Sequence, residues 1–148
     1  MRHVRALSMK ATGRLSVAVL AAAAVGAINM PAANASSGGG CAAANGSTTV
    51  CISASGSHLE PDYYINNSAG TCSSVAVWVD DLNDNSLTIW SDSTVNSGCV
   101  TGHHGPWALD SSNTSGGVVN GHRYVAYMQI NGSSGTAKLE SPAETLSY

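Results

Sequence analysis

Apolar and polar residues alternate along several short stretches of the chain. The period of two is clearest at residues 50–54, 75–79, 87–90 and 124–130, with weaker signals at 63–66 and 107–109. Such alternation is typical of a β-strand with one buried and one solvated face. Residues 137–139 continue the pattern after the loop 131–135, which predicts a hairpin with the preceding stretch. No segment after residue 35 shows a convincing helical period.

The spacing of these stretches predicts an all-β fold. About seven short strands are separated by clusters of Gly, Asn and Ser, which favour turns. Chains of this kind form sandwiches or small barrels. We expect a single antiparallel β-sandwich of the Greek-key or immunoglobulin-like kind, over residues 48–148.

The first 35 residues have the organisation of a secretory signal. A basic leader over 1–14 precedes an apolar run over 15–28, and Ala33-Asn34-Ala35 offers a cleavage site after Ala35. The apolar run is shorter than the roughly 20 residues that a membrane anchor needs. We therefore expect a signal peptide over 1–35 and a secreted, extracellular protein. Apart from Cys41, residues 36–47 are Ser, Gly, Ala and Asn, and we expect them to be flexible until a disulfide of Cys41 anchors them.

All four cysteines follow the predicted signal, at Cys41, Cys51, Cys72 and Cys99. An exported chain meets an oxidising compartment, so two disulfides are expected. No Cys-x-x-Cys occurs, and the wide spacing does not favour a metal site. Three pairings remain open from the sequence, of which we favour Cys41 with Cys51 and Cys72 with Cys99.

Charge narrows the range of partners. Residues 36–148 contain two basic residues, Arg123 and Lys138, and all nine acidic residues, so their formal charge is −7. Such a field repels nucleic-acid phosphates and anionic lipid. We expect no nucleic-acid partner, no membrane contact in the mature form, and a monomer that binds carbohydrate or a secreted protein.

The sequence contains little that indicates catalysis. The chain lacks a Gly-x-Ser-x-Gly elbow, a Ser-x-x-Lys pair and a His-Glu-x-x-His segment. Paired carboxylates could cleave glycosides, but nothing selects two of the acidic residues. We predict no catalytic residue and no enzyme activity.

The tryptophans are the most informative candidates for binding. If Val79 pairs with Leu87 in a hairpin, Trp78 and Trp90 lie on the outer face as diagonal neighbours. Two flat, amphipathic rings there could stack against a sugar or a partner protein, and Tyr63 and Tyr64 could add to them. The alternative is that a loop covers the rings, because a core without Phe must recruit Trp. A one-residue slip in register would put the two rings on opposite faces.

An acidic turn follows the same predicted strand. Residues 80–85 read Asp-Asp-Leu-Asn-Asp-Asn, and Asp81, Asn83 and Asp84 could bind calcium weakly through oxygen ligands. Residues 81–85 resemble the Asp-x-Asn-Asp-Asn calcium segment of cadherin repeats, over five residues only. The alternative is an ordinary solvated turn, which Asp and Asn favour. No other cofactor is expected, and the scattered histidines do not form a metal-binding pattern.

Part of the chain resembles small secreted two-disulfide β-sandwich proteins of actinomycetes, of which the tendamistat-type α-amylase inhibitors are the nearest named family. The resemblance rests on Cys51, residues 63–66, Cys72 and residues 74–81. The resemblance implies a two-disulfide β-sandwich fold and an extracellular location. The family's inhibitory Trp-Arg-Tyr turn is replaced here by Asp62-Tyr63-Tyr64, so no inhibitory residue is carried over.

These observations favour a small secreted, non-catalytic binding protein that recognises carbohydrate or a polymer surface through aromatic residues. One alternative is an inhibitor of an extracellular hydrolase that presents the loop 96–107, which Cys99 would anchor. Another is a secreted structural protein.

Overall fold

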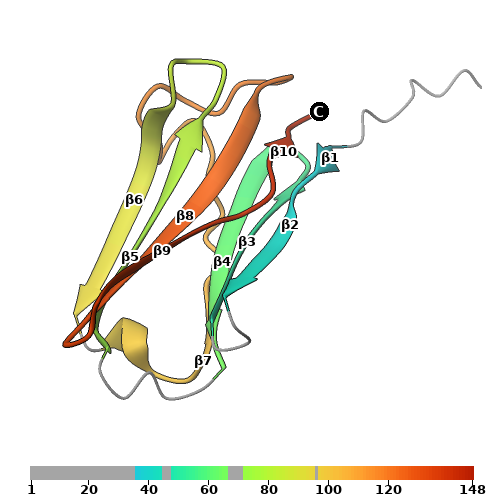
Figure 1. The fold of residues 1–148 in the computed structure, drawn as a ribbon. Coiled ribbons are helices and arrows are strands. Elements are labelled where there is room, and N and C mark those ends of the chain that lie inside the picture. The colour runs from blue at the N-terminus through green and yellow to red at the C-terminus, as the bar shows by residue number, and fades with distance from the viewer. Residues whose placement is uncertain (1–35, 45–47, 67–71, 96) are drawn as a thin grey trace, which may run out of the picture. The chain divides into compact units, whose positions relative to one another are not determined.

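Ten strands in two antiparallel sheets account for most of the described residues, which are 36–44, 48–66, 72–95 and 97–148 of this computed structural model (Figure 1). All of them belong to one compact unit. The predicted signal peptide lies outside the described residues. Within them, no helix is long and apolar enough to cross a membrane.

The first sheet contains six strands. Its order is β1 (Ser37–Gly38), β10 (Glu144–Thr145), β8 (Arg123–Gly132), β5 (Cys72–Asp81) and β6 (Leu87–Val95), with β9 (Gly135–Glu140) also paired to β8. The second sheet has the order β2 (Gly40–Ala44), β3 (Thr48–Ser55), β4 (His58–Ile65) and β7 (Gly102–His104). A short 3₁₀ turn, η1 (Ser97–Cys99), precedes β7. The predicted all-β class with two antiparallel sheets is confirmed.

The chain crosses between the sheets four times. β1 leads to β2, β4 leads to β5, β6 leads to β7, and β7 leads back to β8. β8 then pairs with β5 rather than with β7, which is a return of the Greek-key kind. As a result β5 and β8 are the central strands of the first sheet, and each is hydrogen-bonded to neighbouring strands along both edges.

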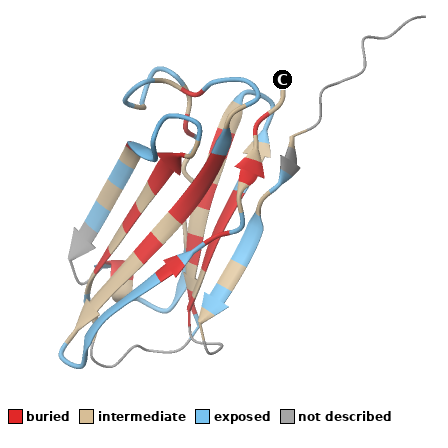
Figure 2. Cartoon of the chain, turned by 45° about the horizontal axis from the view of Figure 1, so that its top comes forward, coloured by how far each residue is buried: buried red, intermediate tan, exposed pale blue. Residues whose placement is uncertain are grey.

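The two-residue period gives each sheet one apolar inner face. In β5 the inner positions are Val75, Val77 and Val79, each at most 2% exposed. Across the core they meet residues of the second sheet such as Ile52 and Leu59, in one continuous hydrophobic cluster. Figure 2 shows buried and partly exposed positions alternating along these strands. The hairpin of β8 with β9 is confirmed, whereas residues 107–109 contribute only a single bridge, Leu59 with Leu109.

Both favoured disulfides are present. Cys41–Cys51 joins directly opposed residues of β2 and β3, and Cys72–Cys99 joins the start of β5 to η1. Each is worth about 2 to 4 kcal/mol through restriction of the unfolded chain. That is a large share of the stability of a domain of this size.

The N-terminal segment takes part in both sheets. Residues 36–44, which we expected to be flexible until a disulfide anchors them, supply β1 beside β10 and β2 beside β3, and Cys41 of β2 forms a disulfide. Small side chains explain the fit, because a Cβ on Gly38 would overlap the carbonyl oxygen of Ala143. Ser36 adds a second link, since its hydroxyl accepts a hydrogen bond from the backbone N–H of Ser147 at 3.0 Å. The folded domain therefore begins well before residue 48.

Glu144 is buried beneath this N-terminal segment. It lies between Gly38 of β1 and Tyr124 of β8 and is 4% exposed. A Cβ on Gly39 would overlap the Glu144 carboxyl group and lie 2.6 Å from the carbonyl oxygen of Ile52. Burial raises the pKa of the Glu144 carboxyl group above its ordinary value of 4.5.

Glu144→Gln should therefore remove a pH dependence of stability. The folded state favours the protonated carboxyl group, and this contribution is lost as the pH rises from 4.5 through the folded-state pKa. We expect the variant to lose less free energy of unfolding over that window and to be the more stable protein at neutral pH. Urea unfolding of both proteins across the window measures the difference. Parallel curves would contradict the raised pKa.

Candidate functional site

The hairpin of β5 with β6 is present, but its register differs from the expected one. Val79 lies opposite Trp90 rather than Leu87, a shift of three positions along β6. An odd shift moves a side chain to the other face of a sheet. Val79 is buried in the core, so Trp90 also points inward, whereas Trp78 points outward. The expectation that Trp78 and Trp90 share the outer face is therefore wrong.

A β-bulge accounts for this register. Thr88 lies opposite Asp80 while Trp90 lies opposite Val79, so Ile89 is an extra residue in β6. Ile89 is buried and Trp90 packs against the same core. Trp90 also meets the indole of Trp107, with ring centroids 5.3 Å apart. Both indoles are partly buried and pack against the hydrophobic core.

Trp78 instead forms an aromatic pair with a residue that the sequence reasoning missed. Tyr127 of β8 lies directly opposite Trp78, and their rings stack with centroids 5.3 Å apart and planes 21° apart. Both rings are partly exposed on the outer face of the first sheet. The alternation of residues 124–130 did separate Tyr127 from the buried positions. That Tyr127 lies beside Trp78 could be found only by knowing that β5 pairs with β8.

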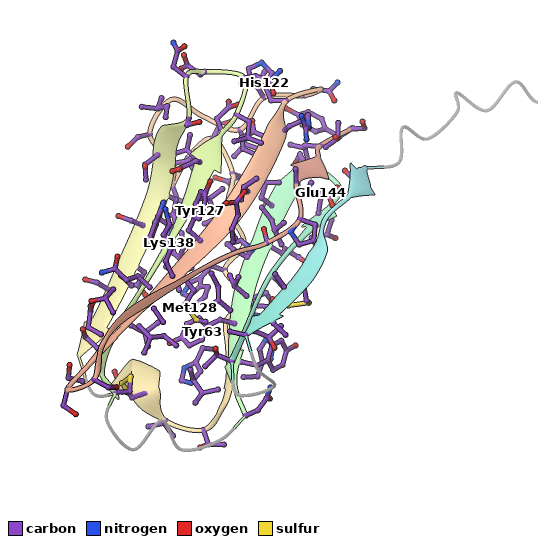
Figure 3. The ribbon with its side chains drawn as sticks, in the orientation of Figure 1. Tyr63, His122, Tyr127, Met128, Lys138 and Glu144 are labelled. Atoms are coloured by element: carbon purple, nitrogen blue, oxygen red, sulfur yellow. A yellow bond between two sulfur atoms is a disulfide. The ribbon has the colours of Figure 1, made fainter. Side chains whose placement is uncertain are left out.

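Lys138 lies over this aromatic pair. It comes from β9, and its Nζ is 4.1 Å from the centroid of the Tyr127 ring and 4.9 Å from that of Trp78. Figure 3 shows Tyr127 and Lys138 beside each other on this face. These are cation–π distances. Within the described part of the chain, no ion pair joins Lys138 to a carboxylate.

A groove lies on the other side of Trp78, toward β6. Its volume is about 440 Å³, and its lining residues are Ala76, Val77, Trp78, Thr88, Ser91, Asp92 and Ser93. Ser91 lies opposite Trp78 and Ser93 opposite Ala76, so these side chains share the outer face. The groove therefore combines one indole with several small hydroxyl groups.

Two acidic residues complete the surroundings of the pair. Thr88 donates a hydrogen bond from Oγ1 to Asp80 Oδ1 at 2.6 Å, and Glu140 lies opposite Tyr127. The pKa of the Tyr127 hydroxyl is raised, first by burial and then by the charges of Glu140 and Asp80. The phenol therefore remains a neutral hydrogen-bond donor at physiological pH.

The two other predicted aromatic residues lie elsewhere. Tyr63 is 2% exposed in the core, and its hydroxyl donates to the carbonyl oxygen of Gly98 at 3.2 Å. Tyr64 points to the outer face of the second sheet and stacks on His103 at 4.4 Å. His103 in turn approaches Asp62 at 2.7 Å. Neither tyrosine joins the surface around Trp78.

The acidic turn is held by its own hydrogen bonds. Asp81 Oδ1 accepts the backbone N–H of Asn83 at 2.8 Å, and Asp81 Oδ2 lies 2.7 Å from Nδ1 of His122. Asn83 Oδ1 accepts the backbone N–H of Arg123 at 2.8 Å, and Asp84 is exposed. Among the described residues, no group of three or more His, Cys, Asp or Glu side chains is arranged to hold a metal ion. The turn's oxygen atoms serve to join β5 to β8.

The segment proposed as an inhibitory loop is tightly held over its described residues, 97–107. Besides the disulfide of Cys99, the carbonyl oxygen of Val100 lies 2.8 Å from Nε2 of His104. Val100 itself is 60% exposed. The loop thus presents one aliphatic side chain on a fixed backbone.

Comparisons with known proteins give no further guide to function. No protein-family model, no curated protein and no solved structure matches this chain significantly.

The two tryptophans should differ sharply in their effect on stability. Trp90→Ala opens a cavity beside Trp107 and should lower the free energy of unfolding by about 3 kcal/mol. Trp78→Ala removes contacts on a solvated face and should cost about 1 kcal/mol. Urea unfolding of both variants measures these losses. A larger loss in Trp78→Ala than in Trp90→Ala would contradict the assigned faces.

Proposed function

We propose that this is a secreted, non-catalytic protein that binds carbohydrate, such as a cell-surface or structural polysaccharide, on the outer face of the first sheet. Trp78 and Tyr127 would be the aromatic contacts, and the adjoining groove would take the sugar hydroxyls. The signal-like residues 1–35 and the two disulfides support an extracellular location.

The groove beside Trp78 carries this proposal. A sugar ring has an apolar face of C–H groups and an equatorial rim of hydroxyls, so it needs a flat hydrophobic wall next to hydrogen-bonding groups. The indole of Trp78 supplies the wall, and Thr88, Ser91 and Ser93 supply hydroxyls within the same 440 Å³ groove. Partly apolar concave sites with a few convergent polar groups are the usual form of a ligand site.

The position of the surface in the sheet favours binding as well. Trp78 lies in β5, which is paired on one side with β6 and on the other with β8. Its backbone is therefore fixed, and its ring is fixed by stacking on Tyr127. A preorganised surface loses little conformational entropy when a ligand binds.

An inhibitor of a secreted hydrolase is the second candidate. The observation in its favour is the exposed Val100 on a loop held by Cys99 and His104. Such an inhibitor would lose its effect in Val100→Asp, whereas polysaccharide binding through Trp78 would be unchanged in that variant.

Depletion of the protein from solution by insoluble polysaccharides tests the primary proposal. We expect at least one plant or cell-wall polymer to adsorb the wild type, and Trp78→Ala to bind about ten-fold or more weakly, as for a central aromatic contact. Tyr64→Ala is the matched control, because Tyr64 is also a stacked, partly exposed aromatic residue but lies on the other sheet. Equal losses in both variants, or no adsorption to any polymer, would refute the proposal.

A further inference from the structure

The aromatic pair already holds a cation, which comes from the protein itself. Lys138 Nζ lies within 5 Å of the centroids of both rings, at 4.1 Å from Tyr127 and 4.9 Å from Trp78. An ammonium group over two aromatic faces is attracted by the negative face of each ring. Such an arrangement has the chemistry of a receptor for an ammonium group.

The surrounding charges strengthen this property. Glu140 lies opposite Tyr127, and Asp80 is close enough that both carboxylates raise the pKa of the Tyr127 hydroxyl. Two carboxylates therefore act on the same Tyr127 side chain whose ring lies under the Lys138 ammonium group. No carboxylate forms an ion pair with Lys138 among the described residues, so the rings are its nearest partners there.

We propose that the Trp78–Tyr127 pair is a binding site for an amino group of the ligand, and that Lys138 occupies this site until the ligand replaces it. The inference rests on the proposed function and narrows its ligand class to polysaccharides that carry free amino groups, such as deacetylated amino-sugar polymers. The neutral part of such a ligand lies in the groove toward β6, and its ammonium group takes the place of Lys138.

The balance of charge over the domain fits this ligand class. The formal charge of −7 over residues 36–148 attracts a polycation. Occupation by Lys138 lowers the apparent affinity for a single amine, since only the fraction of molecules with a vacant site can bind. Attraction of a polymer with many amino groups to the acidic domain raises the concentration of amine beside the site, which favours replacement of Lys138.

Lys138→Met provides the decisive variant. Methionine keeps an unbranched apolar side chain but cannot occupy the site as a cation. We expect adsorption isotherms on partially deacetylated chitin to show about two- to thirty-fold tighter binding by this variant, the range of a cation–π contact. Adsorption to cellulose, which is neutral, should be unchanged.

Arg123→Met is the matched control. It removes the same charge from another exposed side chain, at the start of β8. Arg123 lies opposite Thr145 of β10, away from the aromatic pair. A similar gain in Arg123→Met would show that net charge alone is responsible and would overturn the proposal. Weaker binding to deacetylated chitin in Lys138→Met would also overturn it, because Lys138 would then be a ligand contact.

Two further outcomes separate this inference from the proposed function. Binding of the wild type to neutral polymers with no preference for deacetylated chitin would overturn the inference and leave the proposed function standing. Equal gains on cellulose and deacetylated chitin would overturn it as well, since Lys138 would then be only a steric cover. Failure of every variant to adsorb to any polymer would refute both.

A direct measurement on Lys138 needs no polymer. Rings so close to Nζ should shift the NMR signals of the adjacent methylene protons upfield. Tetramethylammonium chloride should displace the side chain and reduce this shift, whereas sodium chloride at equal concentration should not. Equal responses to the two salts would contradict a cation site at the rings.

Discussion

The bulge at Ile89 decides which aromatic side chains reach the solvent. One extra residue in β6 turns Trp90 inward, where it packs beside Trp107, and leaves small hydroxyl side chains opposite the outer positions of β5. Trp78 therefore faces a groove rather than a second indole across β6. Without the extra residue, Trp90 would lie opposite Trp78 on the outer face, and its indole would no longer pack against the core. Core packing and the candidate ligand surface thus depend on the same local irregularity.

The strand order of the first sheet brings Tyr127 and Lys138 to Trp78, which the hairpin of β5 with β6 cannot do. β8 returns from the second sheet to pair with β5, which sets Tyr127 against Trp78, and β9 follows β8 and carries Lys138 over both rings. Three strands contribute one residue each to a stacked arrangement in which no side chain depends on a loop. In a domain with only two basic residues after residue 35, one of them is held over aromatic rings rather than beside a carboxylate.

Much of this fold follows from local sequence patterns, whereas the surface does not. The two-residue period located the main strands, and spacing favoured the disulfide pairing that is present, because both depend on residues near in sequence. The register of β6 could not be derived, since the pattern of Val79 and Leu87 is satisfied equally well without a bulge. Tyr127 and Lys138 were missed because their proximity to Trp78 depends on pairing across about 50 residues. The place of β1 beside β10 depends on close packing of Gly38 against Ala143, which no local pattern reveals.

Hydroxyl-radical footprinting of the purified protein, with and without an adsorbed polysaccharide, tests the location of the proposed binding surface most directly. Binding on the outer face of the first sheet predicts that polymer slows the oxidation of Trp78 and Tyr127. The oxidation of Trp107, which is partly buried against the core cluster, and of Tyr64 on the second sheet should remain unchanged. Protection of Tyr64 with no protection of Trp78 would contradict the assignment.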